Sequence, residues 1–190
     1  MPNPTRASGI SAIEHYLFGK DGNRPDLLHH AFTDDARLDM HVKTSTIAFP
    51  STVQGRDGIA DVLSRRFGMQ YENVYTFCVG AQPAPDAAVH ACKWLVGMSI
   101  KASGDMRLGC GDYHWAFSPE SGLATHLSIT IEHMLECPPD QLRGIMDWLQ
   151  SQSYPWCDAQ KMVETAPSIA RIEPVLAYIR DTRLTNAVDQ

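Results

Sequence analysis

The spacing of apolar residues near the start of the chain predicts an amphipathic helix. Ile13, Tyr16 and Leu17 recur at helical intervals, which is typical of one buried face. Ser11 and Glu14 have the spacing of a capping box, so we expect the helix to begin at Ser11. Two more helices are expected, one with proline in its first turn over 25–32 and one over 57–68.

From residue 36 the apolar period changes from helical to strictly alternating. Residues 36–43 alternate apolar and polar side chains, as a half-buried strand does. Four further strands are predicted over 74–80, 87–102, 106–118 and 125–135, joined by connections short enough for antiparallel hairpins. Helices followed by an antiparallel meander are typical of an α+β domain. We predict this domain over 1–137 and a helical C-terminal extension over 138–190, packed on the same domain or on a dimer partner.

The composition and charge of the chain argue against several classes of protein. The 190 residues carry a net charge of −6 and no basic cluster, which argues against nucleic acid as a partner. The apolar runs are too short to cross a membrane, and no signal peptide is recognisable near Met1. Five scattered cysteines include no C-x-x-C pair, so reduced thiols are expected. We predict a soluble, cytoplasmic protein.

Two of the predicted strands are long enough to curl around a cavity. Their large side chains fall on shared faces, with Trp94 beside His90 and Trp115 beside Tyr113. An apolar cavity with a few polar groups is the usual form of a small-molecule site. The pattern equally allows a solid core, in which these aromatic residues only pack. If a pocket exists, we expect these residues to line it: Tyr75, His90, Trp94, Tyr113, Trp115 and His133.

The sequence contains none of the common motifs for nucleotide binding, serine hydrolysis or zinc-dependent proteolysis. The sequence contains no P-loop, no G-x-G-x-x-G after a strand, no G-x-S-x-G and no H-E-x-x-H. Asp39 and His41 share one face of a strand, but Arg37 and Lys43 flank them as on a solvated surface. We therefore predict neither a metal nor a cofactor.

The order of these elements resembles a known family. The resemblance spans residues 10–136 and is carried by 13–16 with Asp21, by 28–36, by 55–59 and by 111–115. These segments are similar to the SnoaL-like branch of the nuclear transport factor 2-like superfamily, which includes scytalone dehydratase and ketosteroid isomerase. The resemblance implies a curved antiparallel sheet, three N-terminal helices over its concave face, and a homodimer through the sheet face.

The resemblance also implies a candidate chemistry. Family dehydratases and isomerases act without cofactors on small apolar or aromatic compounds that carry a carbonyl or hydroxyl group. Tyr16 and Asp21 have the family spacing, with Tyr16 as hydrogen-bond donor and Asp21 as acid–base or orienting group. Asp21 equally suits a turn former between Lys20 and Gly22. The family histidine is absent near 73–75, and Trp115 replaces a family carboxylate. A non-catalytic ligand carrier or an interaction module is the alternative.

Overall fold

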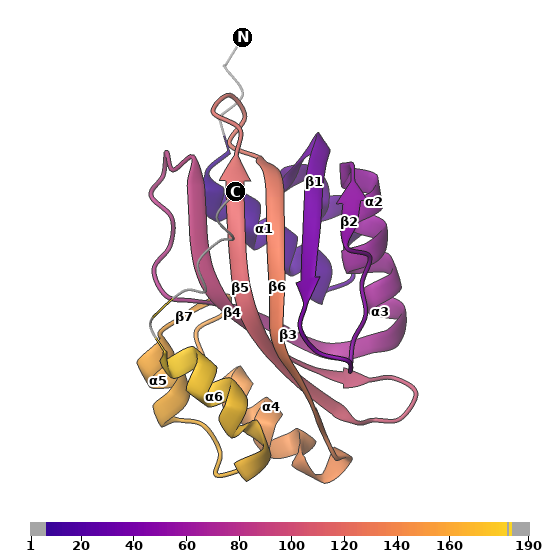
Figure 1. Cartoon of the computed structure of the whole chain (residues 1–190), viewed down its shortest axis with the longest axis vertical. Helices are drawn as coiled ribbons and strands as arrows, with labels where there is room; N and C mark the ends of the chain where they lie inside the picture. Colours follow the sequence, from indigo (N-terminus) through magenta and orange to yellow (C-terminus); the bar gives the residue numbers. More distant parts are fainter. Residues whose placement is uncertain (1–6, 182, 184–190) are drawn as a thin grey trace.

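The computed structural model describes residues 7–181 and 183. Its seven strands form one curved sheet in the order β2-β1-β6-β5-β4-β3-β7 (Figure 1). The strands are β1 (Phe32–Val42), β2 (Thr52–Gln54), β3 (Tyr71–Val79), β4 (Val89–Ile100), β5 (Met106–Phe117), β6 (Ala124–Cys137) and β7 (Trp156–Cys157). The predicted α+β curved sheet is confirmed, because all five predicted strands are present with small shifts at their ends.

The sheet differs from the expectation at its edges. The central strands β3 to β6 pair antiparallel, as predicted. However, β1 runs parallel to β6 and β7 runs parallel to β3, so the sheet is mixed. The short strands β2 and β7 were not predicted, since two or three residues are too few to show an alternation.

A β-bulge bends the sheet near the middle of β6. Gly111 of β5 pairs with Ile131, whereas its neighbour Cys110 pairs with His133, so Glu132 is an extra residue. A Cβ atom on Gly111 would lie 1.8 Å from the carbonyl oxygen of Thr130. Only glycine therefore permits this close approach, and the bulge reverses the side-chain phase of β6 beyond it.

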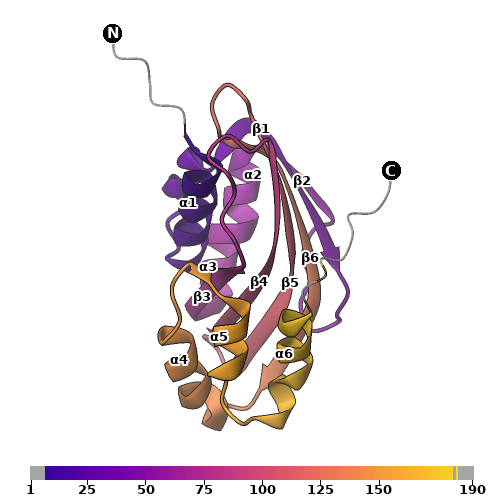
Figure 2. The same ribbon diagram turned by 90° about the vertical axis from the view of Figure 1, so that its left-hand side faces the viewer.

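The N-terminal helical segments cover one face of the sheet, which we call the inner face (Figure 2). They are α1 (Gly9–Asp21), η1 (Pro25–His30), α2 (Arg56–Ala60), the π-helical segment η2 (Asp61–Arg66) and α3 (Phe67–Gln70). The expected start of α1 is wrong by two residues. Ser8 caps the helix by accepting a hydrogen bond from Ser11 N at 3.1 Å, while Glu14 binds Trp156.

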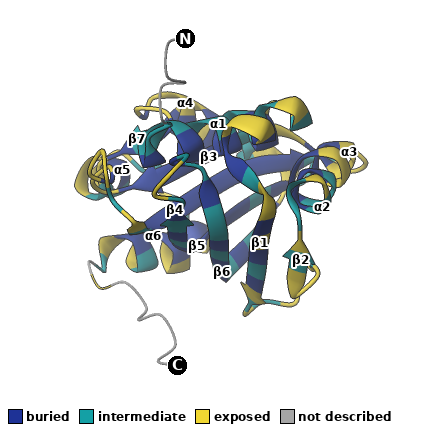
Figure 3. Cartoon of the chain, turned by 90° about the horizontal axis from the view of Figure 1, so that it is seen from above, coloured by how far each residue is buried: buried dark blue, intermediate teal, exposed yellow. Residues whose placement is uncertain are grey.

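The C-terminal helical segments pack on the opposite, outer face of the sheet. They are η3 (Pro139–Gln141), α4 (Leu142–Gln150), α5 (Ala159–Glu164), η4 (Ala170–Ile172) and α6 (Glu173–Arg180). Their apolar residues form a second core with side chains of β3, β4 and β5. As a result the central strands are buried along most of their length (Figure 3).

In the extension predicted to be helical over 138–190, the last helix of the described residues, α6, ends at Arg180. Residue 182 lies outside the described residues. Within the described part of the chain, no helix is long and apolar enough to cross a membrane.

Candidate active site in the inner cavity

A small cavity lies between the inner face of the sheet and the helices above it. Its free volume is about 30 Å³, which is room for a water-sized guest. Four lining residues carry polar groups: Tyr16, Lys20, Thr76 and Tyr113. Apart from the indole N–H of Trp94, the remaining lining is apolar: Met40, Ile47, Phe49, Leu63, Phe67, Trp94, Val96, Met98, Ile129, Ile131 and Met134. We call this space the inner cavity.

Lys20 is the charged residue of the cavity wall, and it was not predicted from the sequence. It lies in the last turn of α1, where the helix dipole favours a cation. Its side chain is 9% exposed, and its Nζ atom donates to Thr76 Oγ1 at 2.7 Å and to Asp21 Oδ1 at 3.1 Å. The ammonium also lies 4.4 Å from the ring centre of Phe67, within range of a cation–π contact.

Asp21 lies behind Lys20 and does not line the cavity. Its carboxylate accepts hydrogen bonds from Thr76 N and Thr76 Oγ1, both at 2.7 Å, and from the Tyr154 hydroxyl at 2.9 Å. With the bond from Lys20, four donors hold this 5% exposed side chain. Asp21 therefore connects the end of α1 to β3, and it reaches the cavity only through Lys20 and Thr76.

Tyr16 reaches the cavity from α1 and meets Tyr113 from β5. Their hydroxyl oxygens are 3.5 Å apart, at the limit of a hydrogen bond. Burial raises the pKa of both hydroxyl groups well above the usual tyrosine value. Both side chains therefore stay protonated and remain able to donate a hydrogen bond to a ligand. The Asp21 side chain makes its hydrogen bonds elsewhere, so Tyr16 and Asp21 do not bond to each other.

The structure brings some of the other expected residues together at the cavity. Trp94 lines it, and its indole N–H donates to the carbonyl oxygen of Thr130 at 3.2 Å. Trp115 lies one layer away, with its ring centre 5.4 Å from that of Tyr16. Trp115 therefore positions Tyr16 and does not contact the free space.

Three expected pocket residues lie elsewhere. Tyr75 is on the outer face, stacked on Phe77, and the next residue, Thr76, faces the cavity instead. His133 also lies on the outer face, 6.2 Å from the ring of Tyr178, because the bulge at Glu132 reverses the phase of β6. His133 therefore does not line the inner cavity.

His90 lies on the inner face but at the far end of β4, outside the cavity lining. Its ring centre is 6.1 Å from that of Trp156, and its neighbour on the same face is Cys92. Hydrogen bonds with Cys78 and His90 lower the pKa of the Cys92 thiol to about 6. The buried Cys78 and Cys92 and the half-buried His90 form a cluster separate from the inner cavity.

The cavity can bind and polarise an oxygen atom, but it offers few bases. Lys20, Tyr16 and Tyr113 are hydrogen-bond donors in apolar surroundings, where such bonds are strong. No carboxylate or imidazole belongs to the described cavity lining. Among residues 7–181 and 183, no cluster of three or more His, Cys, Asp or Glu residues could hold a metal ion.

Comparisons with known proteins identify the fold. No family model matches the chain, and no curated protein matches it by sequence. Among solved structures, a type 2 hexachlorocyclohexane dehydrochlorinase (LinA) gives a TM-score of 0.53 at 15% identity, covering 66% of this chain and 84% of that chain. The Δ5-3-ketosteroid isomerase of Mycobacterium sp. gives 0.52 at 15% identity, covering 64% and 92%.

A third structure, of a Mycobacterium tuberculosis protein in complex with estradiol-17β-hemisuccinate, gives a TM-score of 0.51 at 11% identity, covering 66% of this chain and 93% of that chain. The chain therefore has the nuclear transport factor 2-like, ketosteroid isomerase-like fold, as the residue resemblance predicted. At these identities the likeness concerns the fold alone.

Proposed function

We propose that the chain binds a small, mainly apolar molecule in the inner cavity through one carbonyl or hydroxyl oxygen. The observation that carries this proposal is the buried Lys20 ammonium in a mainly apolar wall. Lys20 and Asp21 already form a neutral pair, so a neutral oxygen acceptor adds no unpaired charge at this point. Tyr16 and Tyr113 supply further donors beside it.

The size of the guest follows from the walls of the cavity. The free volume of about 30 Å³ does not admit an aromatic ring without rearrangement. Three methionines line it (Met40, Met98 and Met134), and methionine side chains adapt readily to irregular shapes. Ile47 and Phe49 come from the connection between β1 and β2. A guest would displace these flexible side chains and keep the Lys20 end of the cavity fixed.

A matched pair of compounds tests the proposal. 1-Indanone and indane have similar shapes, but only indanone carries a carbonyl oxygen. We expect the native protein to bind indanone about tenfold more tightly, as for a hydrogen bond to a charged donor. In the Lys20→Met variant that preference should vanish, while Lys20→Arg should retain part of it. Displacement of the fluorescent probe N-phenyl-1-naphthylamine measures both affinities. Equal affinities in the native protein would contradict the proposal.

A second candidate is cofactor-free turnover of the lyase or isomerase type. A hydrogen-bonded chain runs from the cavity through Lys20, Thr76 and Asp21 to Tyr154, which is 38% exposed. In this reaction Lys20 would donate to the carbonyl oxygen and so acidify the adjacent C–H bond. The Thr76 hydroxyl would take that proton while passing its own to Asp21.

Hydrogen exchange separates this enzyme from a carrier. An enzyme should accelerate the exchange of the C2 protons of 1-indanone for deuterium in D₂O, followed by NMR. Asp21→Asn should slow the exchange at least tenfold while indanone still binds. Binding without accelerated exchange would identify a carrier.

Two further features belong to the proposal. All five cysteines are buried and free, which suits a reducing compartment such as the cytoplasm. A homodimer through the sheet face would use the outer side of β1 and β6, since α4 to α6 cover the outer side of β3 to β5. Light scattering of the purified protein tests this dimer.

A further inference from the structure

A second, larger hollow adjoins the inner cavity. It lies between residues 46–50, the helical residues 62–70 and the adjacent ends of β3 and β5, and its volume is about 450 Å³. Ile47, Phe49 and Phe67 line both spaces, so a wall of three apolar side chains separates them. We call this second space the outer hollow.

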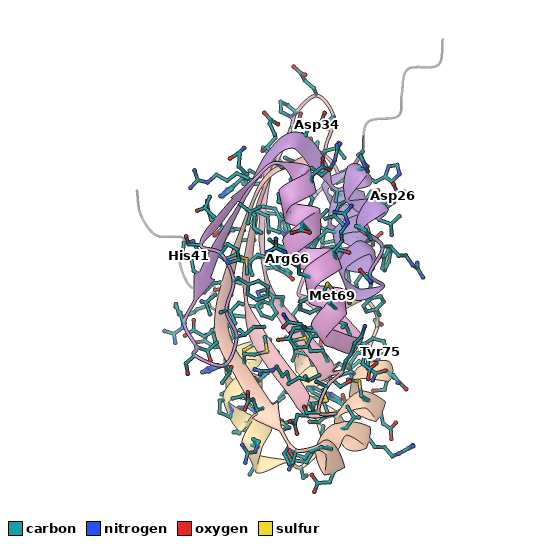
Figure 4. All side chains as sticks on the ribbon, turned by 90° about the vertical axis from the view of Figure 1, so that its right-hand side faces the viewer. Asp26, Asp34, His41, Arg66, Met69 and Tyr75 are labelled. Atoms are coloured by element: carbon teal, nitrogen blue, oxygen red, sulfur yellow. The ribbon has the colours of Figure 1, made fainter. Side chains whose placement is uncertain are left out.

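The charged residues that line the outer hollow are both arginines, Arg66 and Arg107. Their carboxylate partners, Asp61 at 2.7 Å from Arg66 and Glu136 at 2.8 Å from Arg107, do not belong to the lining. The hollow therefore presents positive groups to a guest, although the whole protein carries a net charge of −6. Figure 4 shows Arg66 on the helical segment between β2 and β3, above Met69.

Arg107 retains binding capacity. Its side chain is 11% exposed, and its two terminal nitrogens bind Glu136 and the carbonyl oxygen of Thr46. Its Nε atom is buried without a partner among the described residues. A buried donor without a partner costs free energy, and an acceptor supplied by a ligand would remove that cost.

We propose that the natural ligand is amphipathic and carries an anionic group, a carboxylate or sulfonate, at the end opposite its oxygen-bearing apolar part. The anion binds Arg66 and Arg107 in the outer hollow, and the apolar part passes the wall into the inner cavity. This inference rests on the proposed function, because the apolar part occupies the same cavity. Guanidinium groups suit such anions because they present paired donors in one plane.

In this proposal, binding of the anion to Arg107 also opens the wall between the two spaces. Arg107 holds the connection between β1 and β2 by its bond to Thr46, and the Thr46 hydroxyl donates to the carbonyl oxygen of Met134 at 2.6 Å. An anion that binds Arg107 competes with the carbonyl oxygen of Thr46. The displaced connection carries Ile47 and Phe49 with it, which gives the apolar part access to the inner cavity.

Two fluorescent probes that differ by one anionic group test this inference. 8-Anilino-1-naphthalenesulfonate carries a sulfonate, and N-phenyl-1-naphthylamine has the same rings without it. We expect Arg66→Gln and Arg107→Gln each to weaken binding of the sulfonate probe about five- to tenfold and to leave the neutral probe unchanged. Arg107→Lys should restore part of the loss. Arg180→Gln, which removes an exposed arginine of α6 far from the hollow, is the control.

The outcomes separate the two proposals. If both arginine variants bind the sulfonate probe as tightly as the native protein does, the anion site is wrong while the inner-cavity proposal stands. Val96 lines only the inner cavity, and Val96→Phe should weaken both probes. If neither probe binds the native protein, or if Val96→Phe changes neither affinity, the proposed function fails together with the inference.

Discussion

The protein buries two lysines on opposite faces of one sheet, and their surroundings differ. Lys20 on the inner face and Lys93 on the outer face are 8% and 5% exposed. Each ammonium lies over an aromatic ring, 4.4 Å from the centre of Phe67 and 4.3 Å from that of Tyr178. Burial and ring contact are thus common to both, and the difference lies in what accepts their hydrogen bonds.

Lys93 binds main-chain oxygen atoms at the end of a helix. Its ammonium donates to the carbonyl oxygens of Tyr178 and Asp181, where α6 ends and such groups lack partners within the helix. The Tyr178 hydroxyl donates to the buried Asp112, the residue opposite Lys93 in the register of β4 and β5. Lys93 therefore fastens the C-terminal extension to the sheet.

Lys20 instead binds two side chains, Thr76 and Asp21, and borders free space. Side chains can exchange a hydrogen bond with a ligand more easily than the end of a packed helix can. A buried lysine therefore indicates a binding site when it borders a cavity. It indicates a structural fastening when its acceptors belong to the backbone of a packed element.

The largest effect is expected at Gly111 of β5, which lies opposite Trp94 in the strand register. Gly111→Ala would force its Cβ atom against the carbonyl oxygen of Thr130, 1.8 Å away, and would disrupt the bulge. We expect the free energy of unfolding to fall by about 3 kcal/mol or more, as in severe overpacking. Urea denaturation measures this change.

Gly144→Ala is the matched control, because nothing lies within 4 Å of its added Cβ atom. It sits in α4, where alanine is the better helix former, so stability should rise by about 0.5–1 kcal/mol. A Gly111→Ala variant as stable as the native protein would show that the bulge is not fixed by this contact.

Lys93→Met should come next. It leaves the last carbonyl groups of α6 without their charged donor, and we expect a loss of about 3 kcal/mol in urea denaturation. Proteolysis should then cleave first within the C-terminal extension. Binding of 1-indanone should not change, because Lys93 lies on the other face. Loss of binding at unchanged stability would contradict the distinction between the two lysines.

Lys20→Met should have the opposite effects, a smaller loss of stability than Lys93→Met and a loss of ligand preference. Asp21 keeps three donors from Thr76 and Tyr154, so the loss of stability should be only about 1–2 kcal/mol. The preference for indanone over indane should nevertheless disappear. A variant that loses more stability than Lys93→Met and retains the preference would assign Lys20 a purely structural role.

The sequence predicts the strands and the inner-face residues whose positions follow from local periodicity. Alternation placed the central strands, and together with the resemblance it brought Tyr16, Trp94 and Tyr113 to the inner face. Lys20 was missed because a lysine at the end of a helix is ordinarily solvated. Its burial depends on Thr76, which lies 56 residues further along the chain.

The remaining errors arise from features that periodicity does not show, namely a local bulge and contacts between distant segments. One bulge residue, Glu132, moved His133 to the outer face. Lys93 was not singled out either, since its acceptors, the carbonyl oxygens of Tyr178 and Asp181, lie at the end of α6, 85 and 88 residues away in the chain. Contacts between distant segments thus decided which charged side chains are buried.

The smallest effect is expected where charges stay near solvent, on the uncovered part of the outer face. Hydrogen bonds from Arg37, and further ones from His126 and Thr52, hold the pKa of Asp39 well below its usual value. Because the folded-state pKa of Asp39 is lowered, its carboxylate stabilises the fold fully at pH values above the unfolded-state pKa of about 4. This stabilisation decreases below that pH and is lost as the pH falls through the folded-state pKa. Because the Arg37 side chain is 55% exposed, Asp39→Asn should cost less than about 1 kcal/mol at pH 7.

Urea denaturation of the native protein and of Asp39→Asn at pH 7 and pH 3 measures this contribution. The difference between the two proteins should be largest at pH 7 and smaller at pH 3, because below about pH 4 the unfolded chain takes up a proton at Asp39 that the folded state accepts only at lower pH. Asp35→Asn, at an exposed position of the same strand, should equal the native protein at pH 7. A cost for Asp39→Asn as large as that of Lys93→Met would mean that exposed ion pairs stabilise this fold as strongly as buried charges do, and the contrast between the two faces would lose its physical basis.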